Sequence, residues 1–225
     1  MIMDSNVIIW ILIAVSFTTY LIVNGVYKRL GISNLKQALF TKNGLCLLNM
    51  RYLLGIVLFG ILFYIVALDL RYLVKSITIL RLPVLIVFFL LTLILANISQ
   101  FSIKKQRLEY VGLTHYGLSD AMKYFLIRFA FLFCQEFFFR GVLFFLFLEF
   151  TSVLWATLLC TLLYAIIHVF DSKKELIGAI PLGIILCLFT YLSNSIWYAF
   201  LIHLIFVAVY EISLFYNITF NDSVS

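Results

Sequence analysis

Residues 82–98 read LPVLIVFFLLTLILANI, a run without a charged side chain. An α-helix rises about 1.5 Å per residue, and a helix of about 17–25 residues crosses the roughly 30 Å hydrocarbon core of a bilayer. We therefore expect this segment to span a membrane as a helix.

Further apolar runs lie on both sides of this one. They cover approximately residues 7–23, 52–68, 121–139, 142–150, 153–170, 176–192 and 196–215. The run at 142–150 is short, and we expect it to be a partial or tilted element. The sequence predicts an all-α fold, a polytopic transmembrane bundle of about seven or eight helices.

The composition excludes an ordinary water-soluble domain. Hydrophobic residues make up 65% of the chain and charged residues 12%, whereas soluble domains average about 45–50% and about 25%. The formal charge is +6, but most Lys and Arg residues lie between the apolar runs, without the interleaved aromatics of a nucleic-acid groove. We expect contacts with membrane lipids and no nucleic-acid partner. The four cysteines lack metal-type spacing and are interpreted as packing residues.

The distribution of basic residues predicts the topology. The segment after the first run, residues 28–51, has no acidic residue, and the loop after residue 98 is also basic. The basic side chains in question are Lys28, Arg29, Lys36, Lys42, Arg51, Lys104, Lys105 and Arg107. By the positive-inside rule both loops face the cytoplasm, with the N-terminus outside. The first run is expected to be a retained span, since no basic segment precedes it and no cleavage pattern follows it.

Heavy use of Lys, Ile, Phe, Tyr and Asn is typical of an AT-rich genome and favours a multi-pass protein of a bacterial plasma membrane. We expect one structural domain with two parts. Residues 1–110 would hold the N-terminal helices and the basic loop, and residues 111–225 a helical core with the polar motifs.

Several polar residues interrupt the apolar runs of this core. A charged side chain at the bilayer centre costs about 2.5–3.5 kcal/mol, so such residues usually face a protein interior or a water-filled cavity. They are Gln135, Glu136, Arg140, Glu149, His168, His203 and Glu211. Glu136 and Arg140 are four residues apart, the spacing of an ion pair along one helix face. Alone, such a pair would be interpreted as structural.

Two histidines in separate runs change this interpretation. Tyr164 and His168 lie one turn apart, and His203 lies in the last run. Converging with Glu136 and Arg140, they could polarise a water or stabilise an oxyanion. Two histidines and a carboxylate can also bind zinc, but the HExxH spacing is absent, so we expect no cofactor.

Two polar stretches outside the runs are expected to be surface. His115 lies in one, with Ser119 and Asp120 as helix-cap candidates. The other is a solvated turn that contains Asp171, Lys173, Lys174 and Glu175.

The segment FCQEFFFRGVLFF, residues 133–145, resembles the first motif of the CPBP family, the CAAX-protease and bacteriocin-processing group also called Abi proteins. That motif is Glu-Glu-x-x-x-Arg, usually followed by Gly, and falls on Gln135, Glu136, Arg140 and Gly141. The second motif, Phe-x-x-x-His, is similar to YAIIH, residues 164–168, and the third, His-x-x-x-Asn, to HLIFV, residues 203–207. The resemblance covers about residues 111–215.

The resemblance implies an all-helical intramembrane endopeptidase acting on prenylated or leader-type peptides. It places Gln135, Glu136, Arg140, His168 and His203 at the catalytic positions. Tyr164 and Val207 fall on positions that would contact substrate. The first-motif glutamate would activate a water with the help of the second-motif histidine, and the third motif would form an oxyanion site.

Two departures from the motifs decide what we expect of the chemistry. Gln135 occupies the position of the catalytic glutamate, and a neutral amide cannot take a proton from water. Val207 replaces the asparagine of the third motif and offers no hydrogen-bond donor, a loss that costs about 2.7–4 kcal/mol of transition-state stabilisation elsewhere.

Three hypotheses follow, and the sequence leaves open whether the protein is an enzyme. It is an endopeptidase with Glu136 as a displaced base, or an impaired relative that binds a peptide or membrane-protein partner, as a scaffold or bacteriocin-immunity protein. The third is a transporter, which would need Gly- or Pro-broken helices in two related halves; the sequence shows none. We expect the impaired relative.

Overall fold

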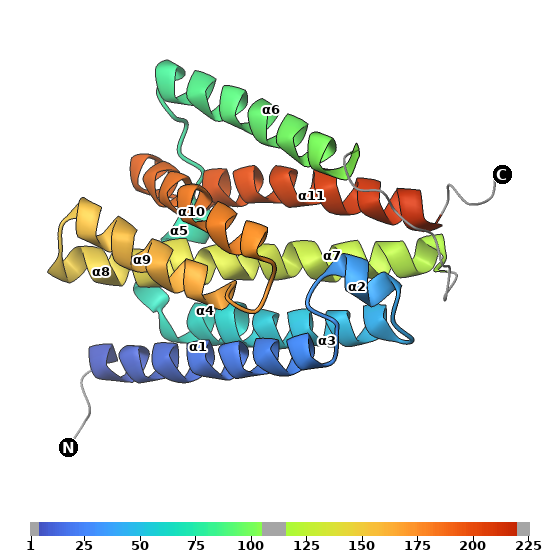
Figure 1. Cartoon of the computed structure of the whole chain (residues 1–225). Helices are drawn as coiled ribbons and strands as arrows, with labels where there is room; N and C mark the ends of the chain where they lie inside the picture. The colour runs from blue at the N-terminus through green and yellow to red at the C-terminus, as the bar shows by residue number, and fades with distance from the viewer. Residues whose placement is uncertain (1–4, 105–115, 220–225) are drawn as a thin grey trace.

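The computed structural model describes residues 5–104 and 116–219, and over these residues it is helical without strands (Figure 1). The predicted all-α fold is confirmed. Within these two ranges six helices are long and apolar enough to cross a membrane: Val7–Arg29, Gly44–Val66, Leu82–Ile103, Leu118–Phe150, Lys173–Ser193 and Trp197–Ile218. A seventh apolar helix, Val153–Ile167, is shorter. The chain is an integral multi-pass membrane protein.

The elements follow one another with short connections. In chain order they are α1 Ser5–Arg29, α2 Leu35–Leu39, α3 Gly44–Gly55, η1 Ile56–Ile61, α4 Leu62–Val66, η2 Leu68–Leu70, α5 Tyr72–Lys75, α6 Leu82–Lys104, α7 Leu118–Glu136, η3 Phe137–Leu143, α8 Phe144–Phe150, α9 Val153–Ile167, α10 Lys173–Ser193 and α11 Trp197–Thr219. The segments η1 and η3 are π-helical turns inside longer helices, whereas η2 is a 3-10 turn.

The runs at 121–139 and 142–150 form one continuous helix, Leu118–Phe150, rather than a helix and a separate short element. The π-turn η3 joins α7 to α8 without a break, because a single glycine, Gly141, does not end a helix when neighbouring helices bury it. Conversely, α9 ends earlier than the run at 153–170 predicted, at Ile167.

Arg51 was expected in the first basic loop, and this expectation is wrong. It lies in α3, 6% exposed, with its guanidinium 5.8 Å from the Tyr27 ring centre and 5.2 Å from that of Tyr52. Aromatic faces attract a cation, and this allows the charge to be buried among helices. The loop before it holds α2, whose first turn is capped by the Asn34 side chain.

The long helix Leu118–Phe150 lies in the middle of the bundle, with α3 and η1 on one side and α9, α10 and α11 around the other (Figure 1). Close packing requires small residues here: a side chain on Gly60 would overlap Cys134, and one on Gly55 would overlap Phe131. Phe59 stacks on Phe138 with ring centres 4.5 Å apart. The central helix is thus held tightly along its motif-bearing half.

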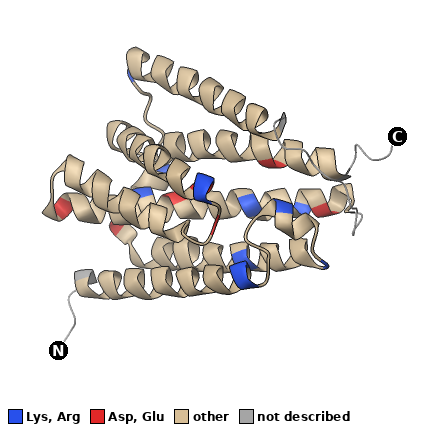
Figure 2. Cartoon of the chain, in the orientation of Figure 1, with Lys and Arg blue, Asp and Glu red and all other residues tan. Residues whose placement is uncertain are grey.

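Helix α6 is peripheral and packs mainly along α11, where the Ser99 hydroxyl donates to the Phe206 carbonyl at 2.8 Å. α1 and α6 run toward the same end of the bundle, and several Lys and Arg positions lie near the end of α1 and around α2 and α3 (Figures 1 and 2). Lys105, Arg107 and His115 lie outside the described residues.

Candidate functional site

The first motif lies where α7 passes into the π-turn η3. The Phe144 backbone N–H donates to the Phe139 carbonyl, five residues earlier, and every residue of η3 is buried. π-turns inside α-helices are frequent at functional sites, because the wider turn displaces the following side chains. The turn places Arg140 wholly inside the protein.

Glu136 is the centre of the polar cluster and is completely buried. Its Oε1 lies 2.6 Å from Nδ1 of His203, and its Oε2 lies 3.3 Å from Nε of Arg140. The ion pair predicted from the four-residue spacing is therefore present, and His203 of α11 completes it. Oε1 is hydrogen-bonded, whereas Oε2 is close to Arg140 but makes no well-oriented hydrogen bond with a described residue.

Tyr164 joins the three motifs. The Arg140 guanidinium lies 4.1 Å from the Tyr164 ring centre, and the ring centres of His168 and His203 lie 4.9 Å and 6.2 Å from it. The Tyr164 hydroxyl is 3.5 Å from Nε2 of His203. The expected convergence of two histidines, a carboxylate and an arginine from different helices is thus what the structure shows.

The carboxylates define the protonation of both imidazoles. A carboxylate oxygen only accepts, so Nδ1 of His203 donates to Glu136, and Nδ1 of His168 donates to Asp171 Oδ2 at 2.8 Å. In each neutral imidazole Nε2 is then an acceptor. That of His203 faces Tyr164, whereas that of His168 is buried without a hydrogen-bond partner in the described structure.

Asp171 is the residue of this site that sequence reasoning missed. It was assigned to a solvated turn, yet its carboxylate binds His168 and is 14% exposed. The available signal was the three-residue spacing of an acid after a histidine at a helix end. Charged turns are so common that the spacing alone did not single it out.

The other predicted positions take no part in the hydrogen bonds around Glu136 and His168. Gln135 is 3% exposed, and its amide makes no hydrogen bond with any described residue. Val207 is half-buried in α11, one turn after His203. Glu149 is exposed at the end of α8. Glu211 belongs to a separate cluster, where it is 3.1 Å from Arg128 Nε.

Arg140 is the least satisfied group of the cluster. None of its three guanidinium nitrogens makes a well-oriented hydrogen bond within the described structure, and the hydroxyls of Thr157 and Thr161 on α9 are likewise buried without partners. Buried donors of this kind mark a place where polar ligand atoms or water are favourable. In the described ranges no three His, Cys, Asp or Glu side chains come together as a candidate metal-ligand group.

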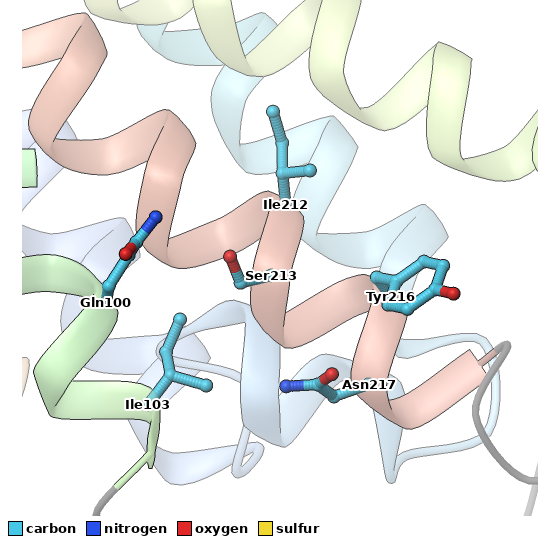
Figure 3. Close-up of a pocket in the computed structure, with 6 residues that line it drawn as sticks. All are labelled: Gln100, Ile103, Ile212, Ser213, Tyr216 and Asn217. Atoms are coloured by element: carbon cyan, nitrogen blue, oxygen red, sulfur yellow. The ribbon is translucent and has the colours of Figure 1, made fainter.

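Two pockets lie near the bundle surface. One of about 420 Å³ is formed by α6 and α11, and Figure 3 shows Gln100, Ser213 and Asn217 among its lining residues; no motif residue reaches it. The other, about 240 Å³, is lined by Phe133, Cys134 and Phe137, the neighbours of Gln135 and Glu136 in sequence, and by residues of η1, α4 and α5. An apolar pocket therefore adjoins the motif helix.

Residues 117–209 match a family model described as type II CAAX prenyl endopeptidase Rce1-like. The three motifs lie inside the matched segment. No curated protein and no solved structure matches the chain. The similarity to the Rce1-like type II CAAX prenyl endopeptidases thus covers residues 117–209, the segment that holds all three motifs.

Proposed function

We propose that this protein binds a peptide or a membrane-protein partner at its motif site and does not hydrolyse it through the glutamate chemistry of its family. The observation that carries the proposal is the state of Glu136. The carboxylate is completely buried, one oxygen accepts from His203, and the other faces Arg140. Oε2 makes no hydrogen bond with the described residues, but it lies in a fully buried site against the Arg140 guanidinium, which competes with a water for its lone pairs.

A displaced base would have to come from this pair. Gln135 offers only an amide, so Glu136 would have to take the proton, and to reach a water outside the buried cluster it would have to leave His203 and Arg140. Breaking a buried ion pair costs about 3–5 kcal/mol. When this cost is added to the activation barrier of hydrolysis, the rate falls by about two to four powers of ten.

The oxyanion side of the reaction is weakened as well. His203 donates from Nδ1 to Glu136, so its neutral Nε2 accepts and cannot stabilise a developing negative charge. Val207, one turn further along α11, has no donor. Neither residue of the third motif therefore supplies the hydrogen bond that the reaction needs.

What remains suits binding. Unsatisfied buried donors on Arg140 and an apolar pocket beside the motif helix together fit a segment with one polar group and one apolar side chain. A bacterial plasma-membrane protein with such a site would act as a scaffold for another enzyme or in immunity to a bacteriocin. We also propose that the chain forms one structural domain with two parts, the N-terminal helices in residues 1–110 and the motif-bearing core in residues 111–225.

A second candidate function is favoured by one observation. Nε2 of His168 is an acceptor with no hydrogen-bond partner, and an imidazole in that state can serve as a general base. In this second candidate function the protein is a peptidase in which His168, and not a glutamate, is the general base.

Cleavage and binding by the purified protein in detergent distinguish the two. Farnesylated CAAX-type and leader-type peptides carrying a fluorophore are tested for hydrolysis and, by anisotropy, for binding to wild type, Gln135→Glu and His168→Ala. We expect wild type to bind without cleaving, and Gln135→Glu to remain silent or gain cleavage. Cleavage by wild type that His168→Ala abolishes would overturn the proposal in favour of the peptidase.

A further inference from the structure

The turn after α9 is held by its own backbone hydrogen bonds and by contacts with α1. His168 caps the C-terminus of α9, and its carbonyl accepts from the Asp171 backbone N–H at 3.0 Å. From α1, the Asn24 amide donates to the Ile167 carbonyl at 3.3 Å. The Phe170 ring packs so closely on Gly25 that a Cβ there would lie 3.3 Å from it. The backbone that carries both His168 and Asp171 is therefore held.

The two side chains on this turn form a short pair. His168 Nδ1 and Asp171 Oδ2 are 2.8 Å apart, with the side chains 23% and 14% exposed. The opposite edge of the ring, which carries Nε2, is buried next to Tyr164 and has no partner among the described residues. An unsatisfied buried acceptor costs about 1–3 kcal/mol. A turn whose only role was to connect α9 to α10 would not require this unsatisfied acceptor.

The carboxylate of Asp171 decides which nitrogen of the facing imidazole carries the proton. An ionised Asp171 accepts from Nδ1 and cannot donate to it, which leaves one tautomer for the neutral His168.

We propose that Asp171 is a positioning residue of the motif site, which fixes His168 in the Nδ1–H tautomer with Nε2 presented inward as a hydrogen-bond acceptor. This nitrogen would accept a hydrogen bond from an N–H or O–H group, such as a peptide amide of the bound partner. The proposal rests on the proposed function only for the presence of a partner, because the tautomer itself is a property of the protein alone.

The test is ¹⁵N spectroscopy of the imidazoles in the full chain, labelled on histidine and kept in detergent near neutral pH. Signals missing from His168→Ala identify His168 among the three histidines. In wild type we expect Nδ1 to be protonated and Nε2 to be unprotonated. In Asp171→Asn the amide can donate to Nδ1, so this tautomer should lose its dominance and Nε2–H should appear.

The matched control is Asp120→Asn, which makes the same chemical change at the first turn of α7, where Asp120 accepts from the Gly117 N–H. It should leave the His168 signals unchanged. Asp171→Asn is preferred to Asp171→Ala because it keeps the size and shape of the side chain. It therefore tests the His168 tautomer even if Asp171→Ala unfolds the protein. A wild-type His168 with Nε2 protonated, or signals that Asp171→Asn does not alter, would overturn the proposal. Failure to bind any peptide would count against the proposed function and not against this assignment.

Discussion

Replacement of Glu136 by glutamine would remove the negative charge from a pair that has no contact with solvent. Arg140 would keep its charge at 0% exposure, with the rings of Tyr164 and Phe139 as its cation–π neighbours among the described residues. The amide oxygen of glutamine can still accept from His203, so the hydrogen bond at 2.6 Å is weakened but not lost. The main effect is an uncompensated buried cation.

The expected loss of stability follows from this arrangement. Removing one partner of a buried ion pair costs about 3–5 kcal/mol, whereas replacing both partners is often close to neutral. Arg140→Met removes the cation with a side chain of similar length. The double variant Glu136→Gln/Arg140→Met should therefore cost about 2–3 kcal/mol less than the sum of the two single variants.

Reversible unfolding by titration of sodium dodecyl sulfate into mixed micelles measures these free energies, with helical circular dichroism as the signal. Glu149→Gln is the matched control, because Glu149 is exposed at the end of α8, and it should lie within about 0.5 kcal/mol of wild type. A Glu136→Gln variant within 1 kcal/mol of wild type, or strictly additive single variants, would refute the reasoning.

The same titration checks three further predictions. Tyr164→Phe keeps the ring against Arg140 and loses only a hydroxyl 3.5 Å from His203, so it should cost less than about 1 kcal/mol, whereas Tyr164→Leu should cost about 2–4 kcal/mol. Gly60→Ala should cost about 1–3 kcal/mol because its methyl would overlap Cys134, while Gly178→Ala, with open space around it, should be neutral or slightly stabilising. Arg128→Met should cost about 3 kcal/mol, since it leaves Glu211 paired only with the Tyr124 hydroxyl. For topology, a reporter inserted after Thr41 should read cytoplasmic, and an external signal would reverse the orientation inferred from the basic loop.

The fold class follows from the sequence because the bilayer leaves few choices. With no water in the hydrocarbon core, backbone groups must be satisfied within the segment, so long apolar runs become helices. The runs therefore predicted the spans, and the four-residue spacing predicted the Glu136–Arg140 pair. Motif order also indicated the family. Each of these depends on local pattern, which a single sequence contains.

Only the tertiary structure decided what the polar residues do. Helix packing decided that Glu136 is hydrogen-bonded to His203 and close to Arg140, that Tyr164 lies near both histidines, and that Arg51 is buried. Asp171 shows the same limit at short range, because whether a turn carboxylate meets solvent or an imidazole depends on where α9 ends and on how α1 packs against the turn. The sequence determines which groups are available, and three-dimensional proximity determines which of them are engaged.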